Sequence, residues 1–353
     1  MGVYRMSKLW KRRVRITVTG GAKSGVEGKT DSGSLTSAVS ENLPQVDRLV
    51  FEQGGSNPTD LKITFDVNYP GIAGYYISEV VIYNLSKEYA NIAIMAGSVV
   101  SIEAGYEDSD SFGLIFKGYL YHPMWEREDV INYKLTLRCI DGSALYTDQN
   151  FIGTTIDKGT RFDTRMNMLR SSAIRQIPMT GTMPTNDKFQ EFERQETIFG
   201  TPARYFEESY NFRGVGELGN TAVFSSGANV TFVDLNDIPC EKEAIVISPN
   251  EGGLIGTPQQ TIYGANFVCL LNPSLRLKVP AVVVKLENTS FIQMTFNPGT
   301  KEMPARMTPT LEFMVIGVRH VGDTRGVNWY TYVTGCNLQG AMPTNLDPKQ
   351  FRG

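Results

Sequence analysis

Apolar and polar residues alternate with a period of two along several stretches of this chain. The clearest stretch is 133–139, where the apolar residues are Tyr133, Leu135, Leu137 and Cys139. Residues 13–18 and 61–67 follow the same pattern. Because successive side chains of a β-strand point to opposite faces, this alternation predicts strands with one face in a core and the other in water.

The first 145 residues form a run of such stretches separated by polar turns. We predict strands at 13–18, 49–52, 61–67, 76–84, 99–106, 114–121 and 131–140, with a short helical turn at 86–93. Residues 20–48, rich in Gly, Ser and Thr at their start, predict a flexible arm. A run of antiparallel strands with one apolar face curls to remove its edges. Residues 1–145 therefore predict an N-terminal antiparallel β-barrel domain.

The middle of the chain changes character. One helical face carries the apolar residues Phe162, Met166, Leu169 and Ala173, and the arginines at 161, 165 and 175 lie off that face. Thr201 followed by Pro202 is typical of a helix start, and we expect this second helix to continue to about residue 210. Residues 146–235 therefore predict a separate mixed α/β domain, a smaller insert in a mainly β chain.

Strand patterns return in the last third. We predict strands at 244–248, 266–271, 281–287, 291–296, 310–318 and 328–334, with a tight polar turn at 321–326 between the last two. Residues 236–353 predict a second antiparallel β-barrel domain with a C-terminal tail. The fold class is thus mainly β with a smaller α+β insert.

Composition narrows the function. The chain has 353 residues, 41% of them hydrophobic and 20% charged, and a formal net charge of −3. A protein that wraps nucleic acid needs a cationic surplus, which is absent. No apolar run reaches the length that spans a bilayer, so we expect no membrane insertion. The basic run from Lys8 to Arg15 lacks a following apolar segment, so we expect no signal peptide. A local anion patch stays open for this run, but a solvated strand edge or a partner contact is the favoured prediction.

The cysteines predict neither a zinc site nor a disulfide framework. Cys139, Cys240, Cys269 and Cys336 are far apart, and no CxxC occurs. Cys139 falls on the apolar face of its strand, which favours a buried, reduced thiol. All four are compatible with folding in a reducing interior such as a cytoplasm.

Several local patterns imitate chemical sites but fail on spacing. The glycine-rich segment 20–30 ends in Gly28-Lys29-Thr30, yet Lys23 stands where a phosphate-binding loop needs Gly. A calcium loop starting at Asp108 would need glutamate at its twelfth position, where the chain has Tyr119. We therefore interpret these segments as a mobile loop and a solvated hairpin tip.

Catalytic patterns are equally weak. The acidic residues Glu191, Glu193 and Glu196 favour a charged surface over a pair of glycosidase carboxylates. There is no G-x-S-x-G, and the only histidines, His122 and His320, are about 200 residues apart. His320 lies beside the turn to Asp323, which favours a turn-stabilising hydrogen bond over a catalytic base. We predict no catalytic, cofactor-binding or metal-binding residues, no cofactor and no enzymatic activity.

Two sets of phrases resemble a known family. The first set lies at 76–86, 104–106, 115–118 and 135–142, and the second at 253–258, 270–273 and 317–326, followed by Trp329. In this fixed order they resemble the baseplate hub proteins of contractile-tailed bacteriophages. The resemblance spans most of residues 60–150 and 240–340. The arm and the middle domain match less well.

The resemblance implies a specific architecture and role. Hub proteins are trimers at the end of the tail tube that carry the central spike, and each chain contains two tail-tube-like barrels. The implied partners are further copies of this chain, the tail tube protein and the central spike protein, with the tape-measure and baseplate wedge proteins as further candidates. Duplex DNA would pass through a central channel without specific binding. The implied location is the virion tail baseplate, assembled in the cytoplasm of the bacterial host.

Three other functions stay open at this point. Another tail-tip protein or a tail tube protein would share the β pattern, although a tube subunit usually needs only one barrel. A tail-associated cell-wall hydrolase would need two carboxylates across a cleft. A sugar-binding β-protein would need no more than an exposed binding face.

Overall fold

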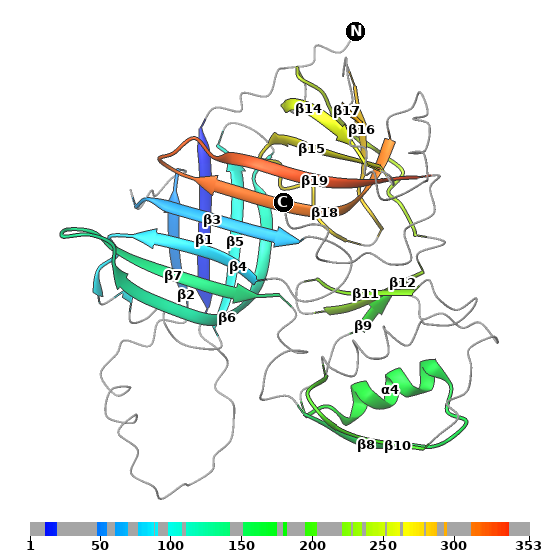
Figure 1. Ribbon diagram of the computed structural model, residues 1–353. Coiled ribbons are helices and arrows are strands. Elements are labelled where there is room, and N and C mark those ends of the chain that lie inside the picture. Colours follow the sequence, from blue (N-terminus) through cyan, green and yellow to red (C-terminus); the bar gives the residue numbers. More distant parts are fainter. Residues whose placement is uncertain are drawn as a thin grey trace, which may run out of the picture.

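The computed structural model describes a mainly β protein with one dominant sheet (Figure 1). The residues described are 11–19, 48–54, 61–69, 77–87, 89–90, 98–107, 111–141, 151–174, 179–181, 195–202, 221–226, 229–234, 238–250, 253–261, 264–278, 280–287, 293–294 and 312–338. The expected arm at 20–47, the segment 182–194 and the second predicted helix beyond Pro202 lie outside these residues.

The N-terminal strands follow the alternation closely. They are β1 (Arg12–Thr19), β2 (Arg48–Gln53), β3 (Ile63–Tyr69), β4 (Ile77–Tyr83), β5 (Val99–Tyr106), β6 (Gly113–Arg127) and β7 (Tyr133–Ile140). All seven pair antiparallel, in the order β3-β4-β7-β6-β5-β1-β2. Ala90 donates its N–H to the carbonyl of Ser86 at 2.9 Å, which confirms a helical turn there.

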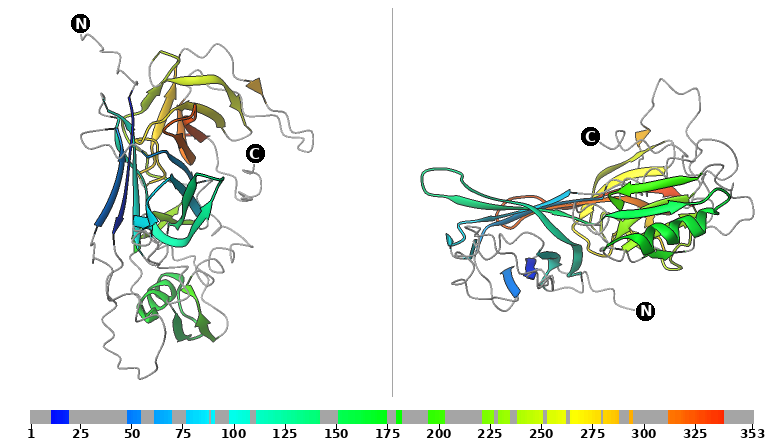
Figure 2. Two further views of the ribbon diagram at one scale, coloured as in Figure 1. Left: turned by 90° about the vertical axis from the view of Figure 1, so that its left-hand side faces the viewer. Right: turned by 90° about the horizontal axis from the view of Figure 1, so that it is seen from below.

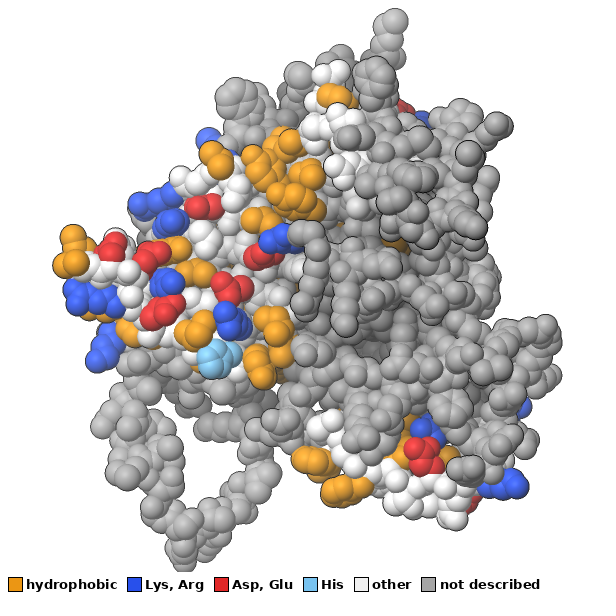
Figure 3. Space-filling view, viewed as in Figure 1, with side chains coloured by type: hydrophobic (Ala, Val, Ile, Leu, Met, Phe, Trp, Pro, Cys, Tyr) orange, Lys and Arg blue, Asp and Glu red, His pale blue; other side chains and the backbone are white. Residues whose placement is uncertain are grey.

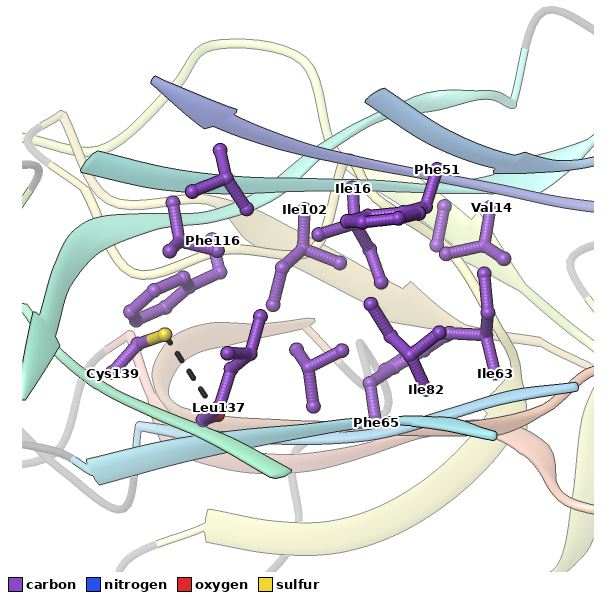
Figure 4. Packing of buried hydrophobic residues seen from close by; sticks show 14 of the residues in the cluster. Val14, Ile16, Phe51, Ile63, Phe65, Ile82, Ile102, Phe116, Leu137 and Cys139 are labelled. Atoms are coloured by element: carbon purple, nitrogen blue, oxygen red, sulfur yellow. Dashed lines mark hydrogen bonds between the residues drawn. The ribbon is translucent and has the colours of Figure 1, made fainter. Parts of the chain in front are cut away.

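The N-terminal sheet folds over its own core (Figure 4). Val14, Ile16, Phe51, Ile102 and Phe116 point inward from one layer, and Ile63, Phe65, Ile82, Leu137 and Cys139 point back at them from the other. Strand β6 serves both layers, because its first half pairs with β5 and its second half with β7 across a register shift at Leu120/His122. Removing these side chains from water supplies the main stabilisation of this half.

The C-terminal strands form a second unit with its own core. They are β13 (Ile245–Ile247), β14 (Leu254–Gln260), β15 (Gly264–Leu270), β16 (Val283–Leu286), β17 (Gln293–Met294), β18 (Glu312–Asp323) and β19 (Trp329–Asn337). Phe267, Val284, Phe313, Val315 and Val333 are among the buried side chains of this second core.

Sequence analysis treated these two β units as separate domains, but a single sheet contains both. Strand β18 pairs with β19 on one side and with β3 on the other, which gives a continuous 14-stranded sheet. The mainly β class is confirmed. Within the described residues, however, no pairing closes the path that runs from β17 to β2, so the expected barrels take the form of open, curled sheets.

The described residues in the middle of the chain form two small sheets and one helix. Strands β8 (Ile152–Ile156) and β10 (Glu196–Gly200) pair antiparallel, and α4 (Phe162–Ser172) contacts β8. Strands β9 (Met179–Gly181), β11 (Thr221–Ser226) and β12 (Asn229–Asp234) form a separate sheet. Figures 1 and 2 place α4, β8 and β10 together at one end of the molecule.

The helix confirms the predicted apolar face and adds a buried charge that the pattern did not indicate. Leu169 is fully buried, as the apolar face requires. Arg165, which lies off that face, is also buried. Its guanidinium donates to the carboxylate of Glu196 on β10, and this ion pair is what allows a charged side chain to leave water.

Candidate functional site: the joint between the two β units

The segment 317–329, part of the second set of family-like phrases, lies where the two β units meet. It forms the end of β18, the turn after it and the first residue of β19. We call the β18–β3 pairing together with the 323–327 turn the joint. Six residue pairs connect β18 to β3, from Val318 opposite Tyr69 to Asp323 opposite Thr64.

An ion pair links the two strands of the joint on the outer face. Arg319 on β18 donates through Nε and Nη2 to the two carboxylate oxygens of Asp66 on β3, at 2.9 and 2.6 Å. This two-pronged geometry suits the planar guanidinium, and the hydrogen bonds to Asp66 raise the pKa of Arg319. Arg319 also lies 5.9 Å from the ring of Tyr332 on β19, so it connects three neighbouring strands.

The turn is shaped by Asp323 and attached to β3 by Thr324. One carboxylate oxygen of Asp323 accepts the N–H groups of Arg325 and Gly326, both at 2.8 Å. Thr324 donates its N–H to the carbonyl of Ile63 and accepts the N–H of Ile63 on its hydroxyl, both at 3.0 Å. The hairpin turn therefore continues the ladder at the start of β3.

Arg12 on β1 holds the same turn from the other layer. Its guanidinium donates to the carbonyls of Asp323 at 2.9 Å and Val327 at 3.1 Å, and also to that of Gly326. It lies 5.5 Å from the centroid of the Trp329 ring, within cation–π range. The basic run thus contributes a structural contact that sequence reasoning missed.

Two aromatic rings fill the space beneath the turn. Phe65 meets Trp329 edge to face, with centroids 5.4 Å apart, and both side chains are almost fully buried. Gly322 lies opposite Phe65 in the ladder, and a Cβ on Gly322 would approach the Phe65 ring to 2.2 Å. Only glycine leaves room for the ring at this position.

His320 is buried inside the joint rather than placed at its turn. Its Nδ1 lies 2.9 Å from the hydroxyl of Thr331 on β19, which also accepts the N–H of Asn272 at 3.0 Å. Burial lowers the pKa of His320 to about 4, against a weak opposing effect of the Leu275 backbone. The ring is therefore neutral at physiological pH, and the expectation of a turn-stabilising contact was wrong about its location.

Two further arginines of the basic run are paired within the chain. Arg13 and Arg15 both donate to Glu52 on β2, at 2.8 and 3.1 Å, and Arg15 also reaches Glu103 on β5. Partial burial opposes ionisation of Glu52, but the hydrogen bonds from Arg15 and Arg13 outweigh it and lower its pKa. Since β1 lies between β2 and β5, the expectation of a solvated strand edge was wrong.

The other candidates are not brought together. The phosphate-loop-like segment 20–30, Asp108, Glu191 and Glu193 lie outside the described residues. Glu196 is paired with Arg165. His122 is exposed on β6, and three strands separate it from buried His320 on β18.

The described residues include no group of three or more His, Cys, Asp and Glu side chains that could hold a metal ion. Their cysteines are free, and burial raises the pKa of Cys139 and Cys269 to about 12. Among the described helices, none is long and apolar enough to cross a bilayer. The joint itself is an arrangement of buried rings, ladders and ion pairs that can hold two units in a fixed relation.

Comparisons with protein-family models and with curated proteins give no match. Solved structures do match. The E. coli c3393 protein is described as a component of the type VI secretion system with structural similarity to the T4 bacteriophage tail proteins gp27 and gp5. It superimposes with a TM-score of 0.50 and 10% identity, over 82% of this chain and 78% of its own.

A chain of the half-lidded Francisella PdpA–VgrG complex gives a TM-score of 0.52 and 8% identity, over 96% of this chain and 60% of its own. The 43 kDa tail protein of prophage MuSo2 from Shewanella oneidensis gives 0.49 and 8%, over 78% of this chain and 96% of its own. At these identities the likeness concerns the fold. The chain has the mainly β fold of the c3393 and PdpA–VgrG structures, which confirms at the level of fold the resemblance to hub proteins.

Proposed function

We propose that this chain is a structural baseplate hub of a contractile phage tail, a homotrimer that connects the hexameric tail tube to the trimeric central spike. The observation that carries the proposal is the joint. Two β units, each with its own core, are held in one continuous sheet by β18, β3 and the Arg12-bound turn. The fold shared with tail-related proteins supports the same role.

The physical task of a hub is to match two symmetries. Three copies that each contribute two β units offer six units to a sixfold ring and three chains to a threefold spike. For this match to work, the two units of one chain must keep a constant relation. A continuous strand ladder with an ion pair and a buried histidine provides that rigidity without any catalytic group.

The net charge supports a channel through which DNA passes rather than a surface that binds DNA. Each chain carries a formal charge of −3, so three copies carry 3 × −3 = −9. Every phosphate paired with Lys or Arg would add salt-dependent affinity that slows transit. The arginines at positions 13, 15 and 319 are already paired with carboxylates of the same chain. We therefore expect a neutral or acidic channel.

The experiment that tests the proposal is imaging of the purified protein together with sedimentation. Threefold particles with an axial opening support the hub. Rings of six or filaments would favour a tail tube protein, and a monomer at all concentrations would contradict both assignments. A zymogram on cell-wall material checks the hydrolase alternative, for which we expect no lysis.

The partner assignments need separate tests. In this proposal the chain contacts the tail tube protein on one side and the spike on the other, with the 20–48 arm reaching a neighbouring subunit. Deleting the arm should weaken trimerisation or tube attachment. If both were unchanged, that role of the arm would be wrong.

A further inference from the structure

The hairpin that connects β6 and β7 carries the most exposed large apolar side chains of the described residues. Val130 is 80% exposed and Ile131 is 81% exposed. Figures 1 and 2 show this hairpin extending beyond the body of the sheet. Two large apolar side chains held in water at the end of a projection form a small, accessible contact surface.

The tip of this hairpin is ordered by its own polar groups. One carboxylate oxygen of Asp129 accepts the N–H groups of Ile131 at 2.8 Å and Asn132 at 2.7 Å. These bonds to Asn132 and Ile131 lower the pKa of Asp129. Arg127 donates to the carbonyls of Asp129 and Val130 from the other side. Since the turn is already fixed, little conformational freedom is lost when the tip is bound.

The stem of the hairpin is stiffened as well. Trp125 and Tyr133 stack with centroids 5.6 Å apart and an angle of 9° between their planes. Asn84, which follows β4, donates to the side chain of Asn132 at 2.9 Å and accepts the N–H of Tyr133 at 3.1 Å. The apolar tip is therefore presented on a rigid support.

A complementary surface lies on the C-terminal unit. The three adjacent strands β14, β15 and β19 contain no Asp, Glu, Lys, Arg or His. On their outer side Ile255, Val268 and Tyr332 lie in register across the strands. Ile255 is 38% exposed and Tyr332 is 41% exposed. We call this surface the uncharged face. Figure 3 shows a patch of hydrophobic side chains in this part of the molecule.

The neighbouring part of the same sheet is charged on its outer side. Arg138 on β7 pairs with Glu79 on β4 at 3.0 Å, and Lys134 pairs with Glu126 at 2.9 Å. In Figure 3 blue and red side chains gather over these strands. A sheet face that stays in water is usually polar, so the absence of charge on β14, β15 and β19 indicates a contact surface.

We propose that the Val130–Ile131 tip of one copy docks on the uncharged face of a second copy of this chain. The second copy is the occupant for two reasons. The described surface offers the tip as an apolar projection and the face as an uncharged acceptor, in which the apolar row Ile255, Val268 and Tyr332 lies beside the neutral polar pair Asn266 and Thr334. The tip and the face lie far apart along one sheet, with β18, β3, β4 and β7 between β19 and β6. A contact between unlike patches on identical chains runs head to tail, and it closes into a ring when the rotation fits.

This inference rests on the proposed homotrimer and specifies its contact. The first test is the double variant V130D/I131D, analysed by sedimentation velocity and light scattering beside the wild type. Buried anchor residues commonly contribute at least ~2 kcal/mol, so the trimer dissociation constant should rise at least ~30-fold. Thermal unfolding of the two proteins, compared at a concentration low enough that both are monomeric, should be the same, because the tip makes no core contact. I174D, at an apolar residue that is 73% exposed and lies outside the tip, the uncharged face and the joint, is the matched control and should leave the trimer intact.

The second test is cross-linking between copies. A chain carrying both I131C and Y332C should form covalent dimers and trimers on mild oxidation, whereas either single variant and the wild type should not. Cys139, Cys269 and Cys336 are buried, so they compete little for the oxidant.

The outcomes distinguish the proposed contact between copies from the proposed hub function. A trimer unaffected by V130D/I131D and not captured by the cysteine pair would overturn this contact and leave the hub function standing. A wild-type monomer would overturn both. Loss of tube attachment with an intact trimer would place the tip on the tail tube, which also overturns the contact between copies.

Discussion

The joint and the uncharged face lie on opposite sides of β18. They differ in how far their side chains are buried or paired within the chain. At the joint, Arg319 pairs with the carboxylate of Asp66, Thr324 bonds to the backbone of Ile63, and Arg12 donates to carbonyls of the turn. All of these partners belong to the same chain. On the uncharged face, Ile255 and Tyr332 remain partly exposed, with no charged residue on their strands. The difference indicates that the first surface serves folding, and the second is the one that we propose for assembly. Substitutions at the joint should cost stability, and substitutions on the face should cost assembly.

The largest effect is expected at Gly322. G322A places a Cβ 2.2 Å from the buried Phe65 ring, so we expect the free energy of unfolding to fall by more than ~3 kcal/mol. Urea denaturation measures it. G113A is the matched control, because the new methyl group there meets only Pro273 at 3.4 Å, and it should cost far less. Equal effects at both positions would mean that the ring at the joint has room to move.

The next effect is a pH dependence due to His320. Its pKa is lowered from the ordinary 6.5 to about 4 in the folded chain, so above pH 6.5 the ring is neutral in both states. Between pH 6.5 and 4 the unfolded chain takes up a proton that the folded chain refuses. Stability is therefore lost as the pH falls, by up to about 3 kcal/mol.

Denaturant titrations of the wild type and H320N at pH 7 and pH 4 isolate this contribution from that of the carboxylates. The loss of stability on acidification should be smaller in H320N. An identical loss in both proteins would show that the ring is not held neutral by burial.

A smaller effect is expected at Arg12. R12A removes the donor to the carbonyls of the 323–327 turn and the contact with Trp329, which should cost about 1–2 kcal/mol. K11A, one residue earlier, breaks an exposed ion pair with Glu107 at 3.7 Å and should be nearly neutral. Thermal unfolding of both variants compares them directly. If R12A were as mild as K11A, the turn would hold without the guanidinium.

The smallest effect on stability is expected on the uncharged face. Y332S should change the free energy of unfolding by less than about 1 kcal/mol, because the side chain is already partly exposed. The same variant should weaken association in sedimentation, whereas R138A on the charged outer face should change neither quantity by much. A large loss of stability in Y332S would erase the distinction between the two surfaces.

Local patterns predicted most of the strands. The alternation at 13–18 and 133–139 became β1 and β7, and the strand expected at 99–106 has the bounds of β5. Strand β14 was missed because Leu254-Ile255-Gly256-Thr257-Pro258 does not alternate and contains a proline, and its pairing with β15 is irregular. Side chains that follow no periodic pattern gave no comparable prediction of secondary structure.

Long-range pairing was beyond sequence reasoning. Nothing near β3 or β18 in the sequence indicates that they are partners, so the continuity of the sheet between the two β units could not be predicted. The burial of Arg165 and His320 was missed for a related reason. A charged or polar side chain enters a core only when a distant partner, here Glu196 or Thr331, is already there. The phrase 317–326 and Trp329 were singled out for their resemblance to hub proteins, and only the structure places them in the joint.

The β18–β3 ladder also determines when the sheet can be completed during synthesis of the chain. Asp66 and Arg319 are separated by 253 positions in the chain. At the usual 5–20 residues per second of translation, β3 waits for about 10–50 s before the ribosome delivers its partner strand. During that interval one side of β3 is an unpaired edge that can capture other nascent polypeptides. Newly made chains should therefore depend on chaperones until β18 (Glu312–Asp323) emerges.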